Sequence, residues 1–195
     1  MQSKPWRHLW HLLGGSFFPI LALFISRGTL LISLGAITAI FVTGETVRFI
    51  SPRVNQWLVS HLGVMLKKEE GFRPTGTTYL LLASVIVFLL FEKYVAIASI
   101  LFLSIGDLMA TVIGERFGKR RALNKSLEGS LACLASCLLI GTVMTRVGPV
   151  MVLPVAMVGA VAATVIELLP IPADDNLTIP PLSAGIMTLA AHYWG

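Results

Sequence analysis

One acidic residue interrupts an apolar stretch of the sequence and is the first residue with the means to do chemistry. Asp107 lies within the apolar run 94–115, about two helical turns before a basic loop. A charged side chain inside a membrane span is costly, so such residues usually mark a functional site. A carboxylate that can bind a metal ion, next to clustered cations, is what phosphate chemistry requires. We therefore expect Asp107 to lie at a site that handles phosphate groups.

A group of cations follows Asp107 between two apolar runs: Arg116, Lys119, Arg120, Arg121 and Lys125. Basic residues at the end of a span most often set membrane topology or contact anionic lipids. The acidic residues on both sides, Asp107 and Glu128, favour a second interpretation, in which the cations neutralise a phosphate chain. The segment is not a P-loop, because the spacing of Gly114 and Gly118 differs from that motif and no Ser or Thr follows Lys119.

Four polar or small residues open the next apolar run: Lys125, Ser126, Glu128 and Gly129. The free N–H groups and the positive dipole end of a helix start suit a phosphate group. Alternatively, Ser126 caps the helix and Glu128 complements its dipole. The sequence leaves both interpretations open.

Small residues recur every four positions before the basic loop, at Ala110, Gly114 and Gly118. In one interpretation they admit a phosphate group or a backbone at close range. In the other they form a small-xxx-small pattern for close packing between membrane helices.

Two adjacent carboxylates follow a proline-containing break in the apolar pattern. Asp174 and Asp175, with Asn176 after them, can hold Mg²⁺ through oxygen ligands, while water and substrate phosphates complete the six-coordinate shell. The chemistry of a solvated turn explains the same residues equally well.

Other side chains form local pairs. Glu45 and Arg48 are three residues apart and can pair across one helical turn. Cys133 and Cys137 share an apolar helix face, where we expect them to pack as small hydrophobic side chains. Two thiols alone make a poor zinc site, and nothing indicates a disulfide framework.

The composition is that of an integral membrane protein. Of the 195 residues, 55% are hydrophobic and 13% are charged, whereas about a quarter of the residues in a soluble domain are charged. The formal charge of +5 does not indicate nucleic-acid binding, because the cations cluster at the ends of apolar runs. We expect one membrane domain over residues 1–195.

Seven apolar runs are candidates for membrane spans, which need about 20 residues each. They cover roughly residues 10–26, 29–49, 76–92, 94–115, 127–145, 148–169 and 179–194. The segment 51–67 has apolar residues at helical spacing, so we predict a short amphipathic helix that lies in the headgroup layer or against the core. The predicted fold class is all-α, a polytopic membrane protein.

Lys and Arg residues concentrate near the N-terminus and in the loops 50–75 and 115–127. The positive-inside rule then places the N-terminus and these loops, together with the loop 170–178, in the cytosol. An odd number of spans places the C-terminus outside. The candidate site residues therefore gather at one face of the membrane.

The run from Asp107 to Gly129 resembles the nucleotide-binding signature of the CTP-dependent polyprenol kinases, the family of dolichol kinase, phytol kinase and CTP-dependent diacylglycerol kinase. The matching residues are Asp107, Ala110, Gly114, Gly118, the basic pair after it, Lys125, Ser126, Glu128 and Gly129. Supporting matches are Arg7 with His11, Glu45 with Arg48, Glu70 before Pro74–Tyr79, and Asp174–Pro180. Some members carry Trp-Pro after the basic position, where this chain has Arg121-Ala122, so the preference for CTP over other nucleotides stays open.

The resemblance implies a membrane kinase that uses CTP or another nucleoside triphosphate, with Mg²⁺, to phosphorylate a polyprenol, a phytol-like alcohol or diacylglycerol. It implies catalytic roles for Asp107, Lys125, Glu128 and Asp175, and Mg²⁺ ligation by Asp107, Asp174 and Asp175. It implies nucleotide contacts from Gly114, Arg116, Gly118, Lys119, Arg120, Ser126, Gly129 and Asn176. Glu128 is either a metal ligand or the base, and we expect the third to fifth spans to hold the lipid tail.

Two other functions fit parts of the pattern. A membrane cytidylyltransferase that forms a CDP-lipid would use similar carboxylates and cations. A small transporter is the alternative without catalysis, although its charges would gather at mid-membrane. We expect the cytoplasmic inner membrane of a prokaryote as the location, because the chain lacks the extra N-terminal spans of dolichol kinases. The sequence does not set the oligomeric state.

Overall fold

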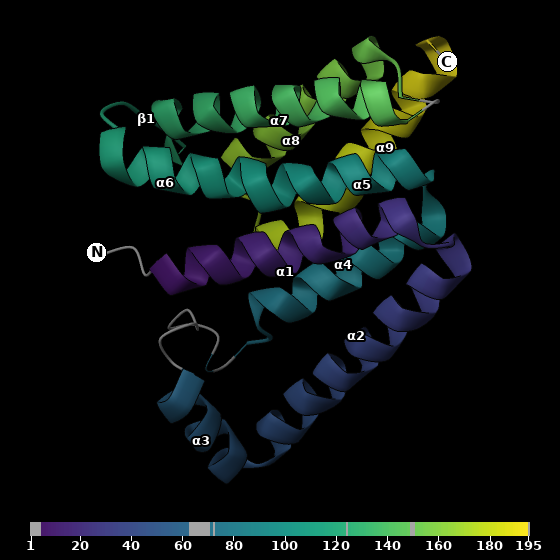
Figure 1. Ribbon diagram of the computed structural model, residues 1–195. Helices are drawn as coiled ribbons and strands as arrows, with labels where there is room; N and C mark the ends of the chain where they lie inside the picture. Colours follow the sequence, from purple (N-terminus) through teal and green to yellow (C-terminus); the bar gives the residue numbers. More distant parts are fainter. Residues whose placement is uncertain (1–4, 63–70, 72, 124, 149–150, 195) are drawn as a thin grey trace.

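The computed structural model of the chain is almost entirely helical (Figure 1). It describes residues 5–62, 71, 73–123, 125–148 and 151–194, without the side chains of Pro5, Arg7 and Leu62. The helices are α1 (Pro5–Phe24), α2 (Arg27–Ile50), α3 (Pro52–Leu62), α4 (Gly76–Leu90), α5 (Lys93–Leu101), η2 (Phe102–Asp107), α6 (Leu108–Phe117), α7 (Leu127–Val147), α8 (Leu153–Leu168) and α9 (Asp175–Trp194). A short hairpin of β1 (Arg121–Ala122) and β2 (Lys125–Ser126) joins α6 to α7.

The apolar runs predicted to span the membrane all form helices. Within the described part of the chain, three helical segments are long and apolar enough to cross a membrane: Arg27–Ile50, Lys93–Phe117 and Leu127–Val147. Shorter apolar helices cover His8–Phe24, Gly76–Leu90 and Leu153–Leu168. The all-α fold class is confirmed, while seven membrane crossings remain a prediction.

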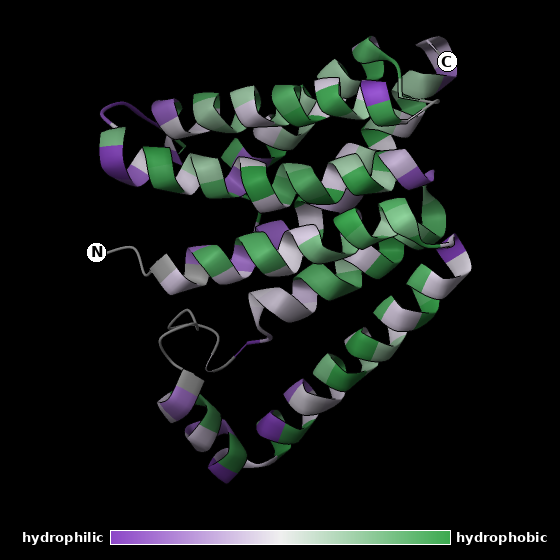
Figure 2. Ribbon diagram, in the orientation of Figure 1, coloured by the Kyte–Doolittle hydropathy of each residue, from purple (hydrophilic) through white to green (hydrophobic). Residues whose placement is uncertain are grey.

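The hydrophilic residues gather at one end of the molecule. The start of α1, the end of α2, α3, the start of α4, the hairpin and the start of α7 all lie at this end (Figure 1). Figure 2 shows hydrophilic colour concentrated there, while the long middle parts of the helices are hydrophobic. The loops predicted to share one face of the membrane therefore do lie together. Which face is cytosolic remains a prediction.

Small residues bring the central helices close together. A Cβ on Gly106 would lie 2.6 Å from Sγ of Cys137, and a Cβ on Gly141 would lie 3.0 Å from that of Ala156. Such close approach is how membrane helices gain packing energy without a hydrophobic drive. Cys133 and Cys137 are free thiols buried in this core, which confirms the expectation that they pack as small hydrophobic side chains.

The long helical segment Lys93–Phe117 changes its winding just before Asp107. Residues Phe102–Asp107 form a π-helical turn, η2, between α5 and α6. Such turns are rare and are frequent at functional sites, because the extra residue changes the direction in which nearby side chains point. The sequence analysis did not predict this turn.

Helix α2 diverges from the other helices toward its C-terminal end (Figure 1). At its start, Arg27 donates from Nε to the carbonyl oxygen of Phe88 at 3.0 Å and from Nη2 to that of Leu89 at 2.8 Å. These carbonyls lie in the last turn of α4, where they have no partner within the helix. Arg27 therefore fixes the start of α2 to the end of α4.

The predicted amphipathic helix is α3. It covers Pro52–Leu62, and the residues 63–67 of the predicted range lie outside the described part of the chain. The apolar side chains of Val54, Trp57 and Val59 are exposed. This exposure favours a helix lying in the headgroup layer over one packed against the core.

Candidate functional site

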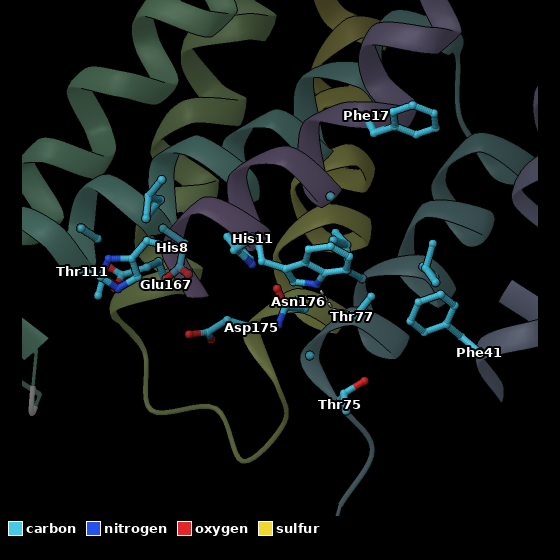
Figure 3. A pocket seen from close by; sticks show the side chains of 18 of the residues that line it. His8, His11, Phe17, Phe41, Thr75, Thr77, Thr111, Glu167, Asp175 and Asn176 are labelled. Carbon is cyan, nitrogen blue, oxygen red and sulfur yellow. Dashed lines mark hydrogen bonds between the residues drawn. The ribbon is translucent and has the colours of Figure 1, made fainter. Parts of the chain in front are cut away.

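A cavity of about 1180 Å³ opens among the helices at the hydrophilic end of the molecule (Figure 3). Its walls come from α1, α2, α4, α6, the hairpin and the facing ends of α7, α8 and α9. Eight of the site residues predicted from sequence line it: Asp107, Gly114, Gly118, Lys125, Ser126, Gly129, Asp175 and Asn176. The fold thus brings Asp175 and Asn176 to the stretch from Asp107 to Gly129, which is far from them in the sequence.

Lys125 joins the hairpin to the connection between α8 and α9. Its Nζ lies 3.0 Å from Oε1 of Glu167 and 3.1 Å from Oδ2 of Asp175, and it also donates to the backbone oxygen of Glu167. Glu167 is 4% exposed, and its Oε2 accepts a hydrogen bond from Ser130 at 3.3 Å. We call Lys125, Glu167 and Asp175 the Lys125 cluster.

The ammonium group of Lys125 stays charged across the physiological pH range. Burial opposes the positive charge of Lys125, but the carboxylates of Asp175 and Glu167 outweigh it and raise the pKa of the ammonium group above the ordinary lysine value. The side chains of Lys125 and Asp175 are each 32% exposed toward the cavity and solvent. A cation held in this way is available to an anionic ligand.

The sequence analysis did not assign a role to Glu167. The signal was present, since Glu167 is a carboxylate at the end of the apolar run 148–169, as Asp107 is in its own run. Asp107 differs from Glu167 because a basic loop and the family signature follow it. Glu167 is the buried partner of Lys125, and it also lines the cavity.

The glycines of the signature serve close packing around Ser126. A Cβ on Gly114 would lie 2.6 Å from Oγ of Ser126, and a Cβ on Gly129 would lie 2.5 Å from the carbonyl oxygen of Ala110. On Gly118 it would lie 2.7 Å from the Ser126 Cβ. Of the two interpretations of these glycines, close helix approach is therefore supported, although all three also line the cavity. Ser126 caps α7 by accepting a hydrogen bond from the N–H of Gly129 at 3.0 Å.

Asp107 lies deeper than the sequence indicated. Helix α6 continues for 10 residues after it, to Phe117. This is about 15 Å, or nearly three helical turns, whereas the sequence predicted about two turns. Asp107 is partly buried, and the cavity extends from the hairpin end down to it. The cavity therefore provides a polar route to a carboxylate that would otherwise lie deep within a membrane span.

The two adjacent aspartates have different surroundings. Oδ1 of Asp174 accepts hydrogen bonds from Asn176, from the backbone N–H at 2.9 Å and from Nδ2 at 2.6 Å. Asp174 thus caps the start of α9 and does not line the cavity, while Asp175 does. Figure 3 shows Asp175 and Asn176 on the cavity wall. Of this pair, only Asp175 is positioned for a ligand in the cavity.

Four other predicted site residues also lie outside the cavity wall: Arg116, Lys119, Arg120 and Glu128. The Glu128 carboxylate accepts hydrogen bonds from the backbone N–H of Arg120, at 3.2 and 3.3 Å, and so orders the start of the hairpin. The side chains of Arg116, Lys119 and Arg120 are exposed. Glu128 is therefore placed as an acid at the start of a helix, and the three cations are placed as basic residues at the end of a span. Both were among the interpretations that the sequence left open.

A second ion cluster fixes the end of α2. Arg48 donates from Nε to Oε2 of Glu45 at 2.5 Å, which confirms the predicted pair across one turn. Its two other nitrogens donate to Oδ1 of Asn55 at 3.2 Å and to the backbone oxygen of Arg73 at 2.6 Å. The guanidinium group is 2% exposed in total and is bound on all sides by protein.

The same cluster reaches the start of α4. Oε1 of Glu45 accepts hydrogen bonds from the N–H of Thr75 at 2.8 Å and from the hydroxyl of Thr78 at 3.0 Å. We call Glu45 and Arg48, with these partners, the Arg48 cluster. It joins α2, α3 and α4, so its first effect is structural. Glu70 lies outside the described residues, as does the side chain of Arg7.

The donor atoms of the cavity suit a magnesium ion. Among the described residues, no three His, Cys, Asp or Glu side chains come together as a ready-made metal site. Mg²⁺, however, is usually held by one or two carboxylates, with water and substrate phosphates as the other ligands. Asp107 and Asp175 both line the cavity and offer carboxylate oxygens, which are the ligand type that a Mg²⁺–nucleotide complex needs.

Comparison with known proteins finds several relatives. An uncharacterised protein of Rickettsia prowazekii is 26% identical over 180 residues, which cover 89% of this chain and 88% of that protein. CTP-dependent diacylglycerol kinase 1 of Schizosaccharomyces pombe is 28% identical over 173 residues, covering 81% of this chain and 78% of the kinase. The kinase of the same name from Eremothecium gossypii is 28% identical over 167 residues, covering 73% of this chain and 53% of the kinase. No family model and no solved structure matches. The named kinases among these relatives support the resemblance to the CTP-dependent lipid kinases that was noted in the sequence.

Proposed function

We propose that this protein transfers the γ-phosphoryl group of CTP to the hydroxyl group of a lipid alcohol. Two of its relatives, at 28% identity, are named CTP-dependent diacylglycerol kinase. The observation that carries the proposal is the composition of the cavity wall. Asp107, Lys125 and Asp175 share one cavity with apolar side chains of α1, α2 and α4. A charged nucleotide and a greasy acceptor need such a combination.

In this proposal Lys125 binds the phosphate chain of the nucleotide. Its bond to Asp175 is partly exposed, so a phosphate oxygen can replace that carboxylate as a partner. Arg121 also lines the cavity and adds a second cation. Lys119 and Arg120 lie outside the wall, and we assign them to the outer part of the nucleotide or to anionic lipid. Phosphoryl transfer depends mainly on such positioning and charge neutralisation.

The proposed reaction is an in-line displacement. The hydroxyl oxygen of the alcohol forms a bond to the γ-phosphorus, the bond from that phosphorus to the bridging oxygen breaks, and CDP leaves with the electron pair. We assign the hydroxyl proton to the carboxylate of Asp175. Mg²⁺, when bound through Asp107, would neutralise charge on the phosphates.

The acceptor we propose first is diacylglycerol, because that is the substrate in the names of the relatives. Polyprenols and phytol-like alcohols are the alternatives, since each offers a hydroxyl on a hydrocarbon tail. We place the reaction at the cytosolic face of a prokaryotic inner membrane, the face to which the basic loops are predicted to belong.

The test uses purified protein in detergent or nanodiscs with CTP labelled at either the α or the γ position. We expect the γ label to appear in a lipid monophosphate and the α label to remain in CDP. UTP, GTP and ATP, tested against the same alcohols, give the nucleotide preference. An α label in the lipid, with release of pyrophosphate, would instead identify a cytidylyltransferase. Lipid flux without nucleotide consumption would identify a transporter.

A further inference from the structure

One part of the cavity wall is apolar. This part, which we call the apolar wing, consists of Phe17 on α1, Ile37, Ile40 and Phe41 on α2, and Leu80 and Leu81 on α4. The third, fourth and fifth predicted spans were expected to hold the lipid tail. Of these only α4 contributes to the wing, because α5 and α7 offer no large apolar side chain to the cavity.

The apolar wing is open on its outer side. Ile40 is 69% exposed and Phe17 is 55% exposed, although both also line the cavity. Figure 3 shows Phe17 and Phe41 on one side of the view, with the polar residues on the other. Helices α1 and α2 are apolar along most of their length, so this opening faces the hydrocarbon of a bilayer. A lipid can therefore reach the cavity sideways without leaving the membrane.

The side chain of Asn176 marks the other end of this path. Asn176 is 6% exposed, and its Oδ1 has no hydrogen-bond partner among the described residues. The orientation of its amide is fixed by Oδ1 of Asp174, an acceptor that also receives the backbone N–H of Asn176. The amide atom that faces this oxygen must be the donor, Nδ2, so Oδ1 of Asn176 points away from it. In the view of Figure 3, Asn176 lies between Asp175 and Thr77. A buried acceptor without a donor is costly unless a ligand supplies one.

We propose that the apolar wing holds the hydrocarbon tail of the acceptor lipid and that Oδ1 of Asn176 accepts the hydrogen bond of its hydroxyl group in the bound state, before that proton passes to Asp175 in the reaction. This inference rests on the proposed function. It makes Asn176 a contact to the acceptor, whereas the family resemblance implied a contact to the nucleotide. It also explains selection for alcohols, since a carboxylate or a phosphate dianion has no proton to donate to an amide oxygen.

Two glycines allow the wing to be filled without disturbing the fold. Gly14 on α1 and Gly44 on α2 line the cavity, and a Cβ on either would meet no described atom within 4 Å. A leucine at either position is also a better helix former than glycine. We expect Gly14→Leu and Gly44→Leu to raise the apparent KM for a long-chain alcohol at least about tenfold, because the side chain occupies the space of the tail. The KM for CTP should change less than about twofold.

Gly35→Leu is the matched control. Gly35 lies on α2, its Cβ position is equally open, and it does not line the cavity. Its leucine variant should keep both KM values of the unmodified protein. If Gly14→Leu and Gly44→Leu behave like Gly35→Leu while the protein is an active kinase, the tail site is wrong and the proposed function stands.

Photo-cross-linking tests the same site without any nucleotide. A long-chain alcohol with a diazirine in its tail should label peptides of α1 and α2, and Gly44→Leu should abolish this labelling. Labelling confined to the outer surface, unchanged in Gly44→Leu, would overturn the proposal. A protein that transfers no phosphate but is labelled in the wing would refute the proposed kinase reaction and support the lipid site.

The hydroxyl contact is tested with Asn176→Ala. We expect an increase of about tenfold in the KM for the alcohol and little change in the KM for CTP, as one hydrogen bond is lost. Thr178→Val is the control, because it removes a hydrogen bond to the same Asp174 from a side chain outside the cavity wall. An increase confined to the KM for CTP would return Asn176 to the nucleotide and overturn this part of the proposal.

Discussion

The two ion clusters at the hydrophilic end of the molecule differ in what they leave available to a ligand. In the Arg48 cluster, the Arg48 and Glu45 side chains are 1% and 10% exposed, and both are hydrogen-bonded to several protein groups. In the Lys125 cluster, the Lys125 and Asp175 side chains are each 32% exposed. Both clusters lie on the wall of the same cavity.

This difference separates a structural role from a binding role. A buried charge that is fully hydrogen-bonded cannot change partners without a large desolvation cost, so it fixes the helices that it joins. A partly exposed charge can exchange a protein partner for a ligand at little cost. We therefore assign binding to the Lys125 cluster and the attachment of α2 to the Arg48 cluster, although both match the family resemblance. The predictions below test this division.

The largest effect is expected from Asp107→Asn. Loss of a metal-binding carboxylate removes several kcal/mol of charge stabilisation, which corresponds to a decrease of about a thousandfold in kcat. The unfolding temperature in detergent should stay within a few degrees. Glu115→Gln is the comparison variant: Glu115 also lines the cavity, but it is an exposed acid farther along the same helical segment, and the variant should keep at least about a third of the activity. Full activity of Asp107→Asn at normal expression would remove Asp107 from the site.

Lys125→Met is expected to lower both activity and stability. Activity should fall about a hundredfold because the phosphate chain loses its cation. Stability should fall as well, because the buried Glu167 loses its partner. The double variant Lys125→Met with Glu167→Gln should recover the unfolding temperature but not the activity. Recovery of both would show that Lys125 is only structural.

Arg48→Met should show the opposite pattern. It leaves the carboxylate of Glu45 buried without its cation, so we expect a loss of about 3–5 kcal/mol in unfolding free energy. The kcat of the protein that remains folded should change less than about threefold. Unfolding curves, with activity measured on the monodisperse fraction, separate the two quantities. A normal unfolding temperature combined with a loss of kcat would contradict the division between the clusters.

The smallest effect is expected from Glu128→Gln. The family resemblance made Glu128 a metal ligand or a base, but its carboxylate instead binds the N–H of Arg120 outside the cavity wall. Glutamine keeps an acceptor at this position, so kcat should fall less than about threefold. A loss as large as that of Asp107→Asn would restore Glu128 to the reaction.

The helices could be predicted from the sequence because each is a long apolar run with clear breaks. The hairpin could not, since Leu123 has a backbone φ of 49°, a region that leucine rarely adopts. The π turn at Phe102–Asp107 also has no known sequence signal. These two departures occur on either side of α6, next to the predicted site.

The site could be predicted only as a region. Asp107 and Lys125, which both belong to the signature, line the same cavity. The sequence pattern did not separate Asp174 from Asp175, because two adjacent acids look alike in sequence and only the direction of α9 decides which one caps the helix. Nor did it identify the wing on α1 and α2, because exposed apolar residues are expected on any membrane helix.

The π turn has a consequence for how this part of the chain can evolve. A π turn holds one residue more than an α-helical turn, so removing one residue from Phe102–Asp107 would restore α-helical winding with little change in how α5 and α6 are aligned. The side chains inside the turn would then point in new directions, while the segment remained as helical and as apolar as before. Along this stretch, the number of residues is constrained more tightly than the identity of most of them.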